Sequence, residues 1–261
     1  PPDANRVGCR IARPPALFLV RPMSDSEARR WYSLNMFSSE DGGAMTKSER
    51  TRAHLREVAL RSFRERGYDA TTIRLIAQEA GVSVGTTNYH FASKSDLVQE
   101  LYLDVQEHHR AAALPRLAEA SGLVDRLRVV YDTGLDQLGP YHAHAAEFVS
   151  AALAPRSLMN PLSVDSEAAR DITVGLFADA VSGAAHALPG DLVAELPRVF
   201  FLSHLLLAMY WVYDDSPGQQ RTRRLLDRGL TLLRLALPLA RVPLLRKPLT
   251  ELAALIGEAR P

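Results

Sequence analysis

Residues 71–91 read Thr71-Thr72-Ile73-Arg74-Leu75-Ile76-Ala77-Gln78-Glu79-Ala80-Gly81-Val82-Ser83-Val84-Gly85-Thr86-Thr87-Asn88-Tyr89-His90-Phe91, and they predict two short helices joined by a tight turn. Thr72 can begin the first helix, because a threonine hydroxyl accepts from the free N–H groups of a first helical turn. Apolar residues then recur at helical spacing as far as Ala80. Gly81 can end this helix, since glycine takes the left-handed conformation that a tight C-terminus needs.

The second helix of the pair is expected to begin at Ser83 and to be short and polar on its outside. Such a helix has little reason to form except as a surface presented to another molecule. A helix-turn-helix over about residues 72–91, with its second helix in the major groove of double-stranded DNA, explains the pattern economically.

Further residues around this motif occur in a recognisable order. They are Phe63-Arg64-Glu65-Arg66-Gly67-Tyr68, Ala70-Thr71-Thr72, Ile76-Ala77, Ala80-Gly81-Val82-Ser83, Gly85-Thr86, Tyr89-His90-Phe91 and Ser93-Lys94. With them, residues 48–109 resemble the tetracycline-repressor-like (TetR) family of bacterial transcriptional regulators. One departure is Thr87-Asn88, where many members have an apolar residue followed by a tyrosine, so base preference does not carry over.

The resemblance implies an all-α fold with an N-terminal three-helix helix-turn-helix domain and a C-terminal helical domain for effector binding and dimerisation. It implies a sequence-specific DNA-binding transcriptional regulator, most often a repressor released from a palindromic operator by a small-molecule effector. No cofactor and no enzymatic activity are expected. The expected location is the cytoplasm, with the protein associated with the nucleoid when it is bound to DNA.

The expected DNA contacts divide into residues that position the protein and residues that read bases. Thr72, Tyr89, His90 and Lys94 match family positions that commonly touch phosphate, and Val84, Thr86, Thr87 and Asn88 are expected to face base edges. Ser83 begins this DNA-contacting helix, and Gly85 lets its backbone come close to the DNA. Asparagine can pair with adenine, and a threonine methyl can touch thymine. Packing against the first helix is the alternative for Tyr89, and a structural role is an equal alternative for His90.

Composition places the chain among ordinary globular proteins. It has 261 residues, 47% of them hydrophobic and 23% charged, and a net charge of +1. Its single cysteine, Cys9, excludes an intramolecular disulfide and suits a reducing cytoplasm. The eight histidines do not pair with carboxylates in a familiar zinc spacing, so no metal site is expected. The longest apolar run, Val199 to Tyr213, is shorter than the roughly 20 residues of a membrane span.

Three regions are expected along the chain. Residues 1–44, rich in Pro, Arg, Ser and Gly, are predicted to be a disordered leader, with a basic arm that tracks DNA as the alternative. Met45 is a candidate biological start. Residues 45–112 form the DNA-binding domain, in which nine Lys or Arg face five Asp or Glu between Met45 and Ser95. Its last helix is expected from Lys94 to about Ala112, with Pro115 as the boundary to residues 113–261.

The C-terminal region is predicted to be helical throughout. Candidate helices run Val124 to Leu138, His142 to Ala154, Ser166 to Leu188, Leu192 to Asp214 and Gln219 to Leu237, with a short one from Leu249 to Glu258. Proline is tolerated only near a helix start, so Pro197 suggests that the fourth begins closer to Glu195. The last two long helices carry apolar faces too broad for a monomer, which predicts a homodimer formed through them. Monomer core is the alternative.

An effector pocket is expected among the helices from His142 to Ala154, Ser166 to Leu188 and Leu192 to Asp214. Its candidate ligand-binding residues are His142, His186, His204, Tyr210 and Trp211. A mostly apolar compound with one or two hydrogen-bonding groups suits this mixture. The helix from Lys94 to Ala112 is the expected lever between the pocket and DNA.

Two other functions were weighed. An enzyme could use His142, His144 and Glu147, which lie close together in the sequence, and His144 and Glu147 could face the same way. No third ligand or nucleophile is placed with that pair, and solvent exposure explains these residues better. A constitutive DNA-binding dimer without a ligand, such as a chromosome-organising protein, is the alternative to a ligand-controlled regulator.

Overall fold

The computed structural model describes residues 45–154, 156–185 and 190–238, with a few residues between 247 and 255. The described residues from Lys47 onward form one compact unit. Its elements are α2 (Lys47–Ala70), α3 (Ile73–Glu79), α4 (Val84–His90), α5 (Lys94–Glu119), α6 (Leu123–Leu138), the 3₁₀ helix η1 (Gly139–His144), α7 (Ala145–Leu153), α8 (Glu167–Ser182), α9 (Gly190–Val212), the 3₁₀ helix η2 (Pro217–Gln219) and α10 (Gln220–Ala236). The described part of the chain contains no strand, so the all-α prediction is confirmed. The predicted leader, residues 1–44, and most of the helix expected from Leu249 to Glu258 lie outside the described residues.

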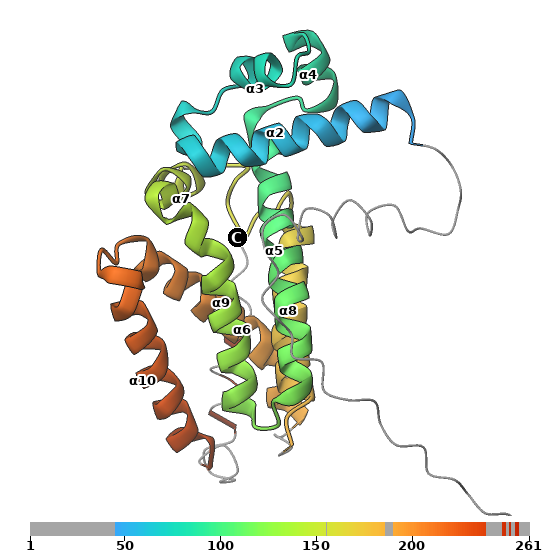
Figure 1. The fold of residues 1–261 in the computed structure, drawn as a ribbon. Coiled ribbons are helices and arrows are strands. Elements are labelled where there is room, and N and C mark those ends of the chain that lie inside the picture. Colours follow the sequence, from blue (N-terminus) through green and yellow to red (C-terminus); the bar gives the residue numbers. More distant parts are fainter. Residues whose placement is uncertain are drawn as a thin grey trace, which may run out of the picture. The chain divides into compact units, whose positions relative to one another are not determined.

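The helix-turn-helix forms from local signals that the sequence displays. The Thr72 hydroxyl accepts from the Leu75 N–H at 3.1 Å and begins α3. Gly81 has a φ of +67°, and the N–H groups of Gly81 and Val82 donate to carbonyls of the last turn of α3, which closes the helix end. The Ser83 hydroxyl then accepts from the Thr86 N–H at 3.0 Å and begins α4. Figure 1 shows α3 and α4 together above α2.

Helix α5 is longer than the sequence predicts. Ser93 and Asp96 form a reciprocal capping box at its start, but the helix continues through Pro115 to Glu119 instead of ending near Ala112. Ala113 and Leu117 are buried on either side of the proline, and their packing offsets the hydrogen bond that Pro115 cannot donate. A single helix therefore runs from the recognition motif deep into the C-terminal helices (Figure 1).

Three other boundaries differ from expectation. Helix α8 ends at Ser182 and not at Leu188, with Gly183 as its C-cap. The segment expected as one helix from His142 begins as η1 and becomes α-helical only at Ala145. Helix α9 begins at Gly190, about two turns before Pro197, because Leu192 packs against Leu196 and Val199 and keeps the segment helical. Val193 and Leu196, shortly before Pro197, also pack against the core formed with other helices, which offsets the hydrogen bond that the proline cannot donate.

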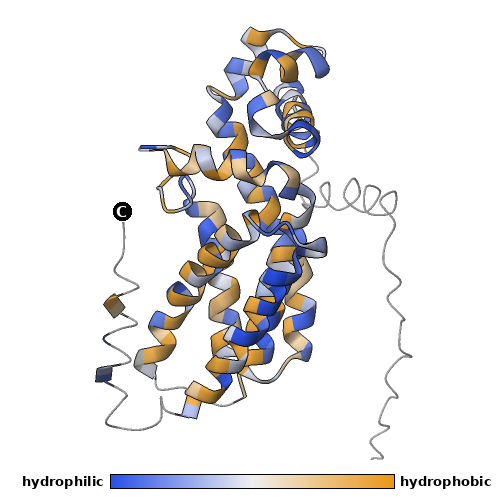
Figure 2. Ribbon diagram, turned by 90° about the vertical axis from the view of Figure 1, so that its left-hand side faces the viewer, coloured by the Kyte–Doolittle hydropathy of each residue, from blue (hydrophilic) through white to orange (hydrophobic). Residues whose placement is uncertain are grey.

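The described apolar residues form two main cores. One joins α5, α6, α8, α9 and α10; the other joins α2, α3 and the start of α5, and it also takes in Phe148 and Ala152 of α7. Figure 2 shows hydrophobic residues in orange along the helices, interspersed with hydrophilic ones in blue. Residues Leu192–Val212 are long and apolar enough to cross a membrane by composition alone, with a mean hydropathy of 1.6. Their contacts with α7, α8 and α10 make this helix part of the protein core instead.

Candidate DNA interface and ligand cavity

Helix α4 presents a short, exposed face at the end of the unit that is farthest from α10 (Figure 1). Tyr89 is 81% exposed, and Asn88, Gly85 and Val84 are exposed beside it. The Tyr89 ring contacts only the edge of the neighbouring His90 ring among the described aromatic contacts, at 5.1 Å between centroids. The alternative of Tyr89 packed against the first helix is therefore wrong. Side chains this open can reach a groove of DNA without any rearrangement of the core.

Thr87 does not belong to the base-reading set. Its side chain is fully buried, and its hydroxyl donates to the Ser83 carbonyl at 3.3 Å. It lies on the inner face of α4, where the helix packs against α3. The prediction that Thr87 reads bases is wrong, because one face of a seven-residue helix must pack against the protein that holds it.

Most arginines of α2 are occupied within the protein. Arg52 and Arg56 pair with Glu100, Arg56 also pairs with Asp104, and Arg66 pairs with Glu79. These ion pairs hold α2 against α3 and α5 and leave little of that charge for DNA. These arginines therefore lie on the surface of α2, and their ion pairs also join α2 to its neighbouring helices.

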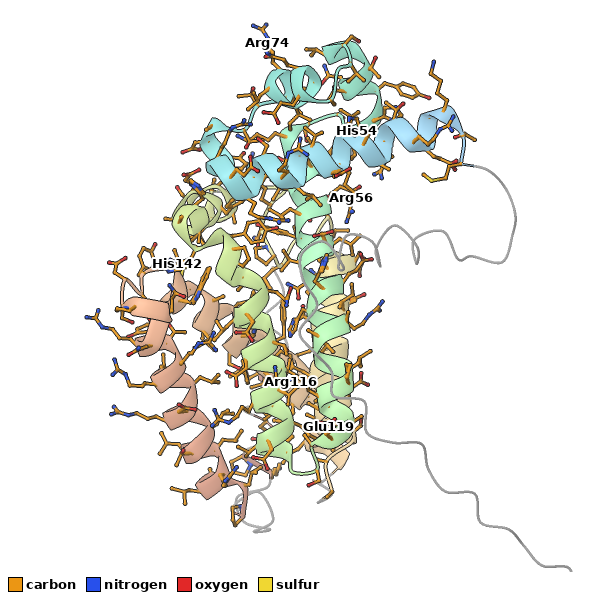
Figure 3. All side chains as sticks on the ribbon, in the orientation of Figure 1. His54, Arg56, Arg74, Arg116, Glu119 and His142 are labelled. Atoms are coloured by element: carbon orange, nitrogen blue, oxygen red, sulfur yellow. The ribbon has the colours of Figure 1, made fainter. Side chains whose placement is uncertain are left out.

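Arg74 is a DNA-contact candidate that the sequence analysis missed. It is exposed in the first turn of α3, and it forms no ion pair with an acid among the described residues. Figure 3 shows it projecting outward from the end of the unit that carries α3 and α4. A cation next to the cap residue Thr72 is well placed to neutralise a phosphate.

Lys94 occupies a different environment from the one that the sequence suggested. Its ammonium lies 3.7 Å from the centre of the Tyr68 ring, a cation–π contact that ties the start of α5 to the end of α2. Partial burial holds the pKa of Lys94 below its ordinary value, against the opposing charges of Asp69 and Glu147. In the absence of DNA this lysine therefore contributes to the packing of the DNA-binding unit.

A cavity of about 350 Å³ lies below the DNA-binding unit. Its lining comes from α5, η1, α7, the loop of residues 160–166, α8 and α9; the polar or aromatic members are Tyr102, Gln106, Tyr141, Phe148, Asn160, Ser166, Arg170, Thr173, Phe201, His204 and Trp211. The rest of the wall is mainly apolar. Size and lining are those of a site for a drug-sized, mostly hydrophobic molecule.

Helix α7 connects this cavity to the DNA-binding unit. Phe148 lines the cavity and also packs edge-on against Phe63 and Tyr68, at 5.7 and 5.8 Å between ring centroids. The neighbouring Glu147 accepts from the backbone N–H of Asp69 at 2.9 Å. Burial tends to raise the pKa of Glu147, but this bond and the contact with His144 outweigh it and hold the pKa below its ordinary value.

Gly67 makes this junction possible. It has a φ of +79°, and a Cβ there would lie 2.5 Å from the Glu147 carboxylate and 2.6 Å from His144 Nδ1. The glycine ends the regular part of α2 as the sequence predicted, and it also lets α7 approach closely.

The sequence comparisons identify the family. Residues 55–101 match the family of bacterial regulatory proteins called tetR, and residues 126–246 match the tetracyclin repressor-like C-terminal domain. HTH-type transcriptional regulator TtgR of Pseudomonas putida is 30% identical over 216 residues, which are 77% of this chain and 97% of TtgR. The chain belongs to the TetR family.

Other TetR-family proteins match over shorter or more divergent stretches. HTH-type transcriptional repressor KstR2 of Mycobacterium tuberculosis is 31% identical over 101 residues, 39% of this chain and 50% of KstR2. The crystal structure of a tetR-family regulator from Streptomyces coelicolor superposes with a TM-score of 0.55 at 18% identity, covering 82% of this chain and 92% of that one. These matches support a TetR-type fold and a transcriptional regulator, which is not an enzyme.

The TetR-type structure places only two of the five candidate ligand residues on the cavity. His204 and Trp211 line it. His142 does not; its Nε2 lies 3.1 Å from the Trp211 carbonyl and its ring packs edge-on against that indole. Tyr210 is 44% exposed on the outer side of α9, away from the cavity lining. His186 lies outside the described residues. Helical spacing identified the correct helix but could not show which of its faces turns inward.

His144 and Glu147, weighed above as members of an active site, form part of the junction between α7 and α2. His144 Nδ1 lies 3.2 Å from Glu147 Oε1, while Glu147 Oε2 accepts from Asp69. Both side chains are half-buried, so simple solvent exposure does not describe them either. Through these contacts, His144 and Glu147 link the C-terminal helices to the end of α2 in the DNA-binding unit.

Two buried histidines next to the cavity make the fold sensitive to acid. His109 and His204 stack with ring centroids 6.0 Å apart, and burial lowers the pKa of both, that of His204 to about 3. An unfolded histidine titrates near 6.5, so the unfolded state binds protons first as the pH falls. We expect the free energy of unfolding to decrease from pH 6.5 towards pH 4, by roughly 1.4 kcal/mol per unit for His204 alone.

Chemical denaturation at a series of pH values measures this slope. His204→Leu is expected to make it shallower, whereas His54→Ala should leave it unchanged because His54 is exposed on α2 (Figure 3). An equal slope in wild type and His204→Leu would contradict the prediction.

Proposed function

We propose that this TetR-family chain is a homodimeric repressor that leaves a palindromic operator when a small, mostly apolar effector enters the cavity. The observation that carries the proposal is the position of the cavity, whose walls include α5 and α7, two helices that also contact the DNA-binding unit. The related KstR2 is named a transcriptional repressor. The proposed site of action is DNA in the cytoplasm.

The proposed DNA surface consists of α4 and the start of α3. The residues proposed to read bases are Val84, Gly85, Thr86 and Asn88, and those proposed to position the protein are Thr72, Arg74, Ser83, Tyr89, His90 and Lys94. Asn88 is the exposed side chain best suited to pair with one base, because an amide can bond both edges of adenine. Arg74 and Lys94 supply charge for phosphates.

Dimerisation is proposed through α9 and α10, as in the sequence-based prediction. Leu206 of α9 and Tyr213, directly after α9, are 73% and 67% exposed, and Leu232 and Leu235 of α10 are 67% and 71% exposed. Helix α10 lies at the outer edge of the helices (Figure 1). Apolar side chains gathered on two neighbouring outer helices are typical of an interface.

Coupling between effector and DNA requires that the effector distinguish two arrangements of the protein. A ligand in the cavity would press on Gln106 of α5 and Phe148 of α7. Movement of α5 would shift the recognition motif directly, and movement of α7 would act through Glu147 and Asp69. The coupling through α5, which was proposed from the sequence, is thus joined by a second coupling through α7.

A constitutive DNA-binding dimer remains the alternative, and the cavity is the feature that disfavours it. Selection of bound DNA from a random pool, followed by operator titration with and without a metabolite panel, tests the proposal. A palindrome with half-sites about 34–36 Å apart or slightly more is the expected result. An asymmetric site, or an operator affinity that no cavity ligand changes, would count against it.

Substitutions in the proposed DNA surface should separate positioning from reading. Arg74→Ala is expected to weaken binding to all sequences and to reduce the slope of log K against log salt by about one per subunit. Asn88→Ala should instead cost on the order of 1–3 kcal/mol at one base pair of each half-site and relax preference there. Fluorescence anisotropy at several salt concentrations measures both. An altered base preference with Arg74→Ala and an unchanged salt slope would reverse the two roles.

A further inference from the structure

The charge of the cavity wall already restricts its ligand. Among the described residues that line the cavity none is acidic, and the lining includes one cationic residue, Arg170. The Arg170 guanidinium donates to the Ser163 carbonyl at 2.8 Å and to the Pro161 carbonyl at 3.4 Å, so it braces the loop that closes one side. A cationic ligand would lose its hydration without gaining a counter-charge.

The polar part of the wall is a short network around Gln106. One end of the Gln106 amide lies 2.8 Å from the Thr173 hydroxyl and 3.1 Å from His109 Nδ1. His109 Nε2 lies 2.9 Å from the carbonyl of Val130, and the His109 ring is 1% exposed. A carbonyl can only accept, so His109 Nε2 must carry a proton.

Burial also keeps His109 neutral, because its pKa is lowered. A neutral imidazole protonated at Nε2 has a bare, accepting Nδ1. The end of the Gln106 amide that faces Nδ1 must then be the NH₂ group, since a carbonyl oxygen there would place two acceptors together. The two ends of an amide have the same shape, and the network decides between them.

With that orientation each donor in the network has a partner. The Gln106 NH₂ group donates to His109 Nδ1 and to the Thr173 hydroxyl, and Thr173 donates to the Ala169 carbonyl, which lies 3.3 Å away. The Gln106 carbonyl oxygen is left without a protein partner among the described residues. Since Gln106 lines the cavity, this oxygen is the acceptor that the wall can offer to a ligand.

His204 adds a second unsatisfied group to the same wall. It is 5% exposed, it lines the cavity, and its Nδ1 is buried without a hydrogen-bond partner among the described residues. Its ring stacks on that of His109, which contacts Gln106. This nitrogen has almost no accessible surface, so a ligand in the cavity reaches it only if the His204 ring shifts.

We propose that the effector is an uncharged, mostly apolar molecule that carries a hydroxyl or N–H group. This group donates a hydrogen bond to the Gln106 carbonyl and lies on the part of the cavity wall that includes His204. This proposal rests on the proposed function for the existence of an effector, and it adds the class of molecule. A hydroxyl suits the wall because it can donate to the Gln106 carbonyl oxygen. A methyl ether of the same shape cannot donate and leaves the Gln106 oxygen unpaired.

Calorimetric titration of the full chain with four matched probes tests the class: 2-naphthol, 2-methoxynaphthalene, 2-naphthoate and protonated 2-(aminomethyl)naphthalene. We expect 2-naphthol to bind at least tenfold more tightly than each of the other three. Gln106→Met keeps the length of the side chain and removes the acceptor, and it should reduce the preference for 2-naphthol over its methyl ether to less than about threefold. Gln78→Met is the matched control, because Gln78 is exposed on α3 and does not line the cavity.

Each other outcome overturns the inference. Equal binding of 2-naphthol and its ether, tightest binding of the cation or the carboxylate, an unchanged preference in Gln106→Met, or no binding of any probe would do so. Loss of the preference in both Gln106→Met and Gln78→Met would also do so. Operator affinity is measured separately in the presence of 2-naphthol. A hydroxyl preference that depends on Gln106, without any change in operator affinity, would uphold the ligand class while removing the proposed release mechanism.

Discussion

Leu232→Glu is expected to convert the protein into a folded monomer that no longer holds its operator. Leu232 is 67% exposed on α10, so glutamate is tolerated in the single chain, where it meets water. In the proposed dimer the same carboxylate would be buried against apolar side chains of the partner, which is strongly unfavourable. A monomer engages one half-site alone, and we expect operator affinity to fall by about 100-fold or more, roughly 2.7 kcal/mol.

Val164→Glu is the matched control for this change. Val164 is 81% exposed in the loop between α7 and α8, and it lies on neither α9 nor α10. The same gain of charge there should alter neither the sedimentation coefficient nor operator affinity. Circular dichroism separates unfolding from dissociation, because a folded monomer keeps its helix content. A Leu232→Glu protein that sediments as a dimer at micromolar concentration would rule out α10 as the interface.

The elements that the sequence predicted well are those set by neighbours in the chain. The caps Thr72, Ser83 and Ser93 and the left-handed Gly81 each act within a few residues, and all four occur as expected. The predicted helix ends at the prolines were wrong because they too were judged only from neighbours in the chain. A local rule places helix ends near Pro115 and Pro197, but contacts with distant helices outweigh the single lost hydrogen bond.

The site shows the same limit. The burial of Thr87 was signalled in the resemblance, since many TetR-family members have an apolar residue at that position; threonine fits there because its hydroxyl bonds to Ser83. The junction of Glu147 with Asp69 joins residues 78 positions apart, and no spacing in one sequence reveals it. Which of His204, Tyr210 and Trp211 faces the cavity depends on how α9 is rotated about its axis, which only packing fixes.

Arg126→Met is expected to cause a large loss of stability. The guanidinium is 9% exposed, and it donates to four backbone carbonyls: Leu117 at 2.6 Å, Ala120 at 2.8 Å, Asp179 at 2.9 Å and Ala180 at 3.1 Å. The first two lie at the end of α5 and the other two near the end of α8, so one charge satisfies the free carbonyls of two helix C-termini. Methionine keeps most of the apolar stem and removes all four bonds; the Asp179 carbonyl keeps the Gly183 N–H as a donor, and the carbonyls of Leu117, Ala120 and Ala180 lose their guanidinium donors.

The expected cost of Arg126→Met is about 3–5 kcal/mol in urea denaturation, since hydrogen bonds to a charged group count for about 1.5–3 kcal/mol each and do not add fully. Arg126→Lys keeps the charge but loses the planar fork, and it should recover part of the loss. A loss of stability below about 0.5 kcal/mol, the range of an ordinary surface substitution, would mean that water can donate hydrogen bonds to these carbonyls in place of the guanidinium.

Gly183 provides an independent test of the same contact. A Cβ at this position would collide with the Arg126 guanidinium, while the φ of −82° suits alanine. Gly183→Ala alone should therefore cost about 1–2 kcal/mol by displacing the hydrogen bonds to α8. In the Arg126→Met background the collision is absent, and the same change should be neutral or slightly stabilising, because alanine restricts the unfolded chain more than glycine does. A coupling energy of about 1–2 kcal/mol in this double-mutant cycle is the expected result, and simple additivity would show that Arg126 does not hold the two helix ends together.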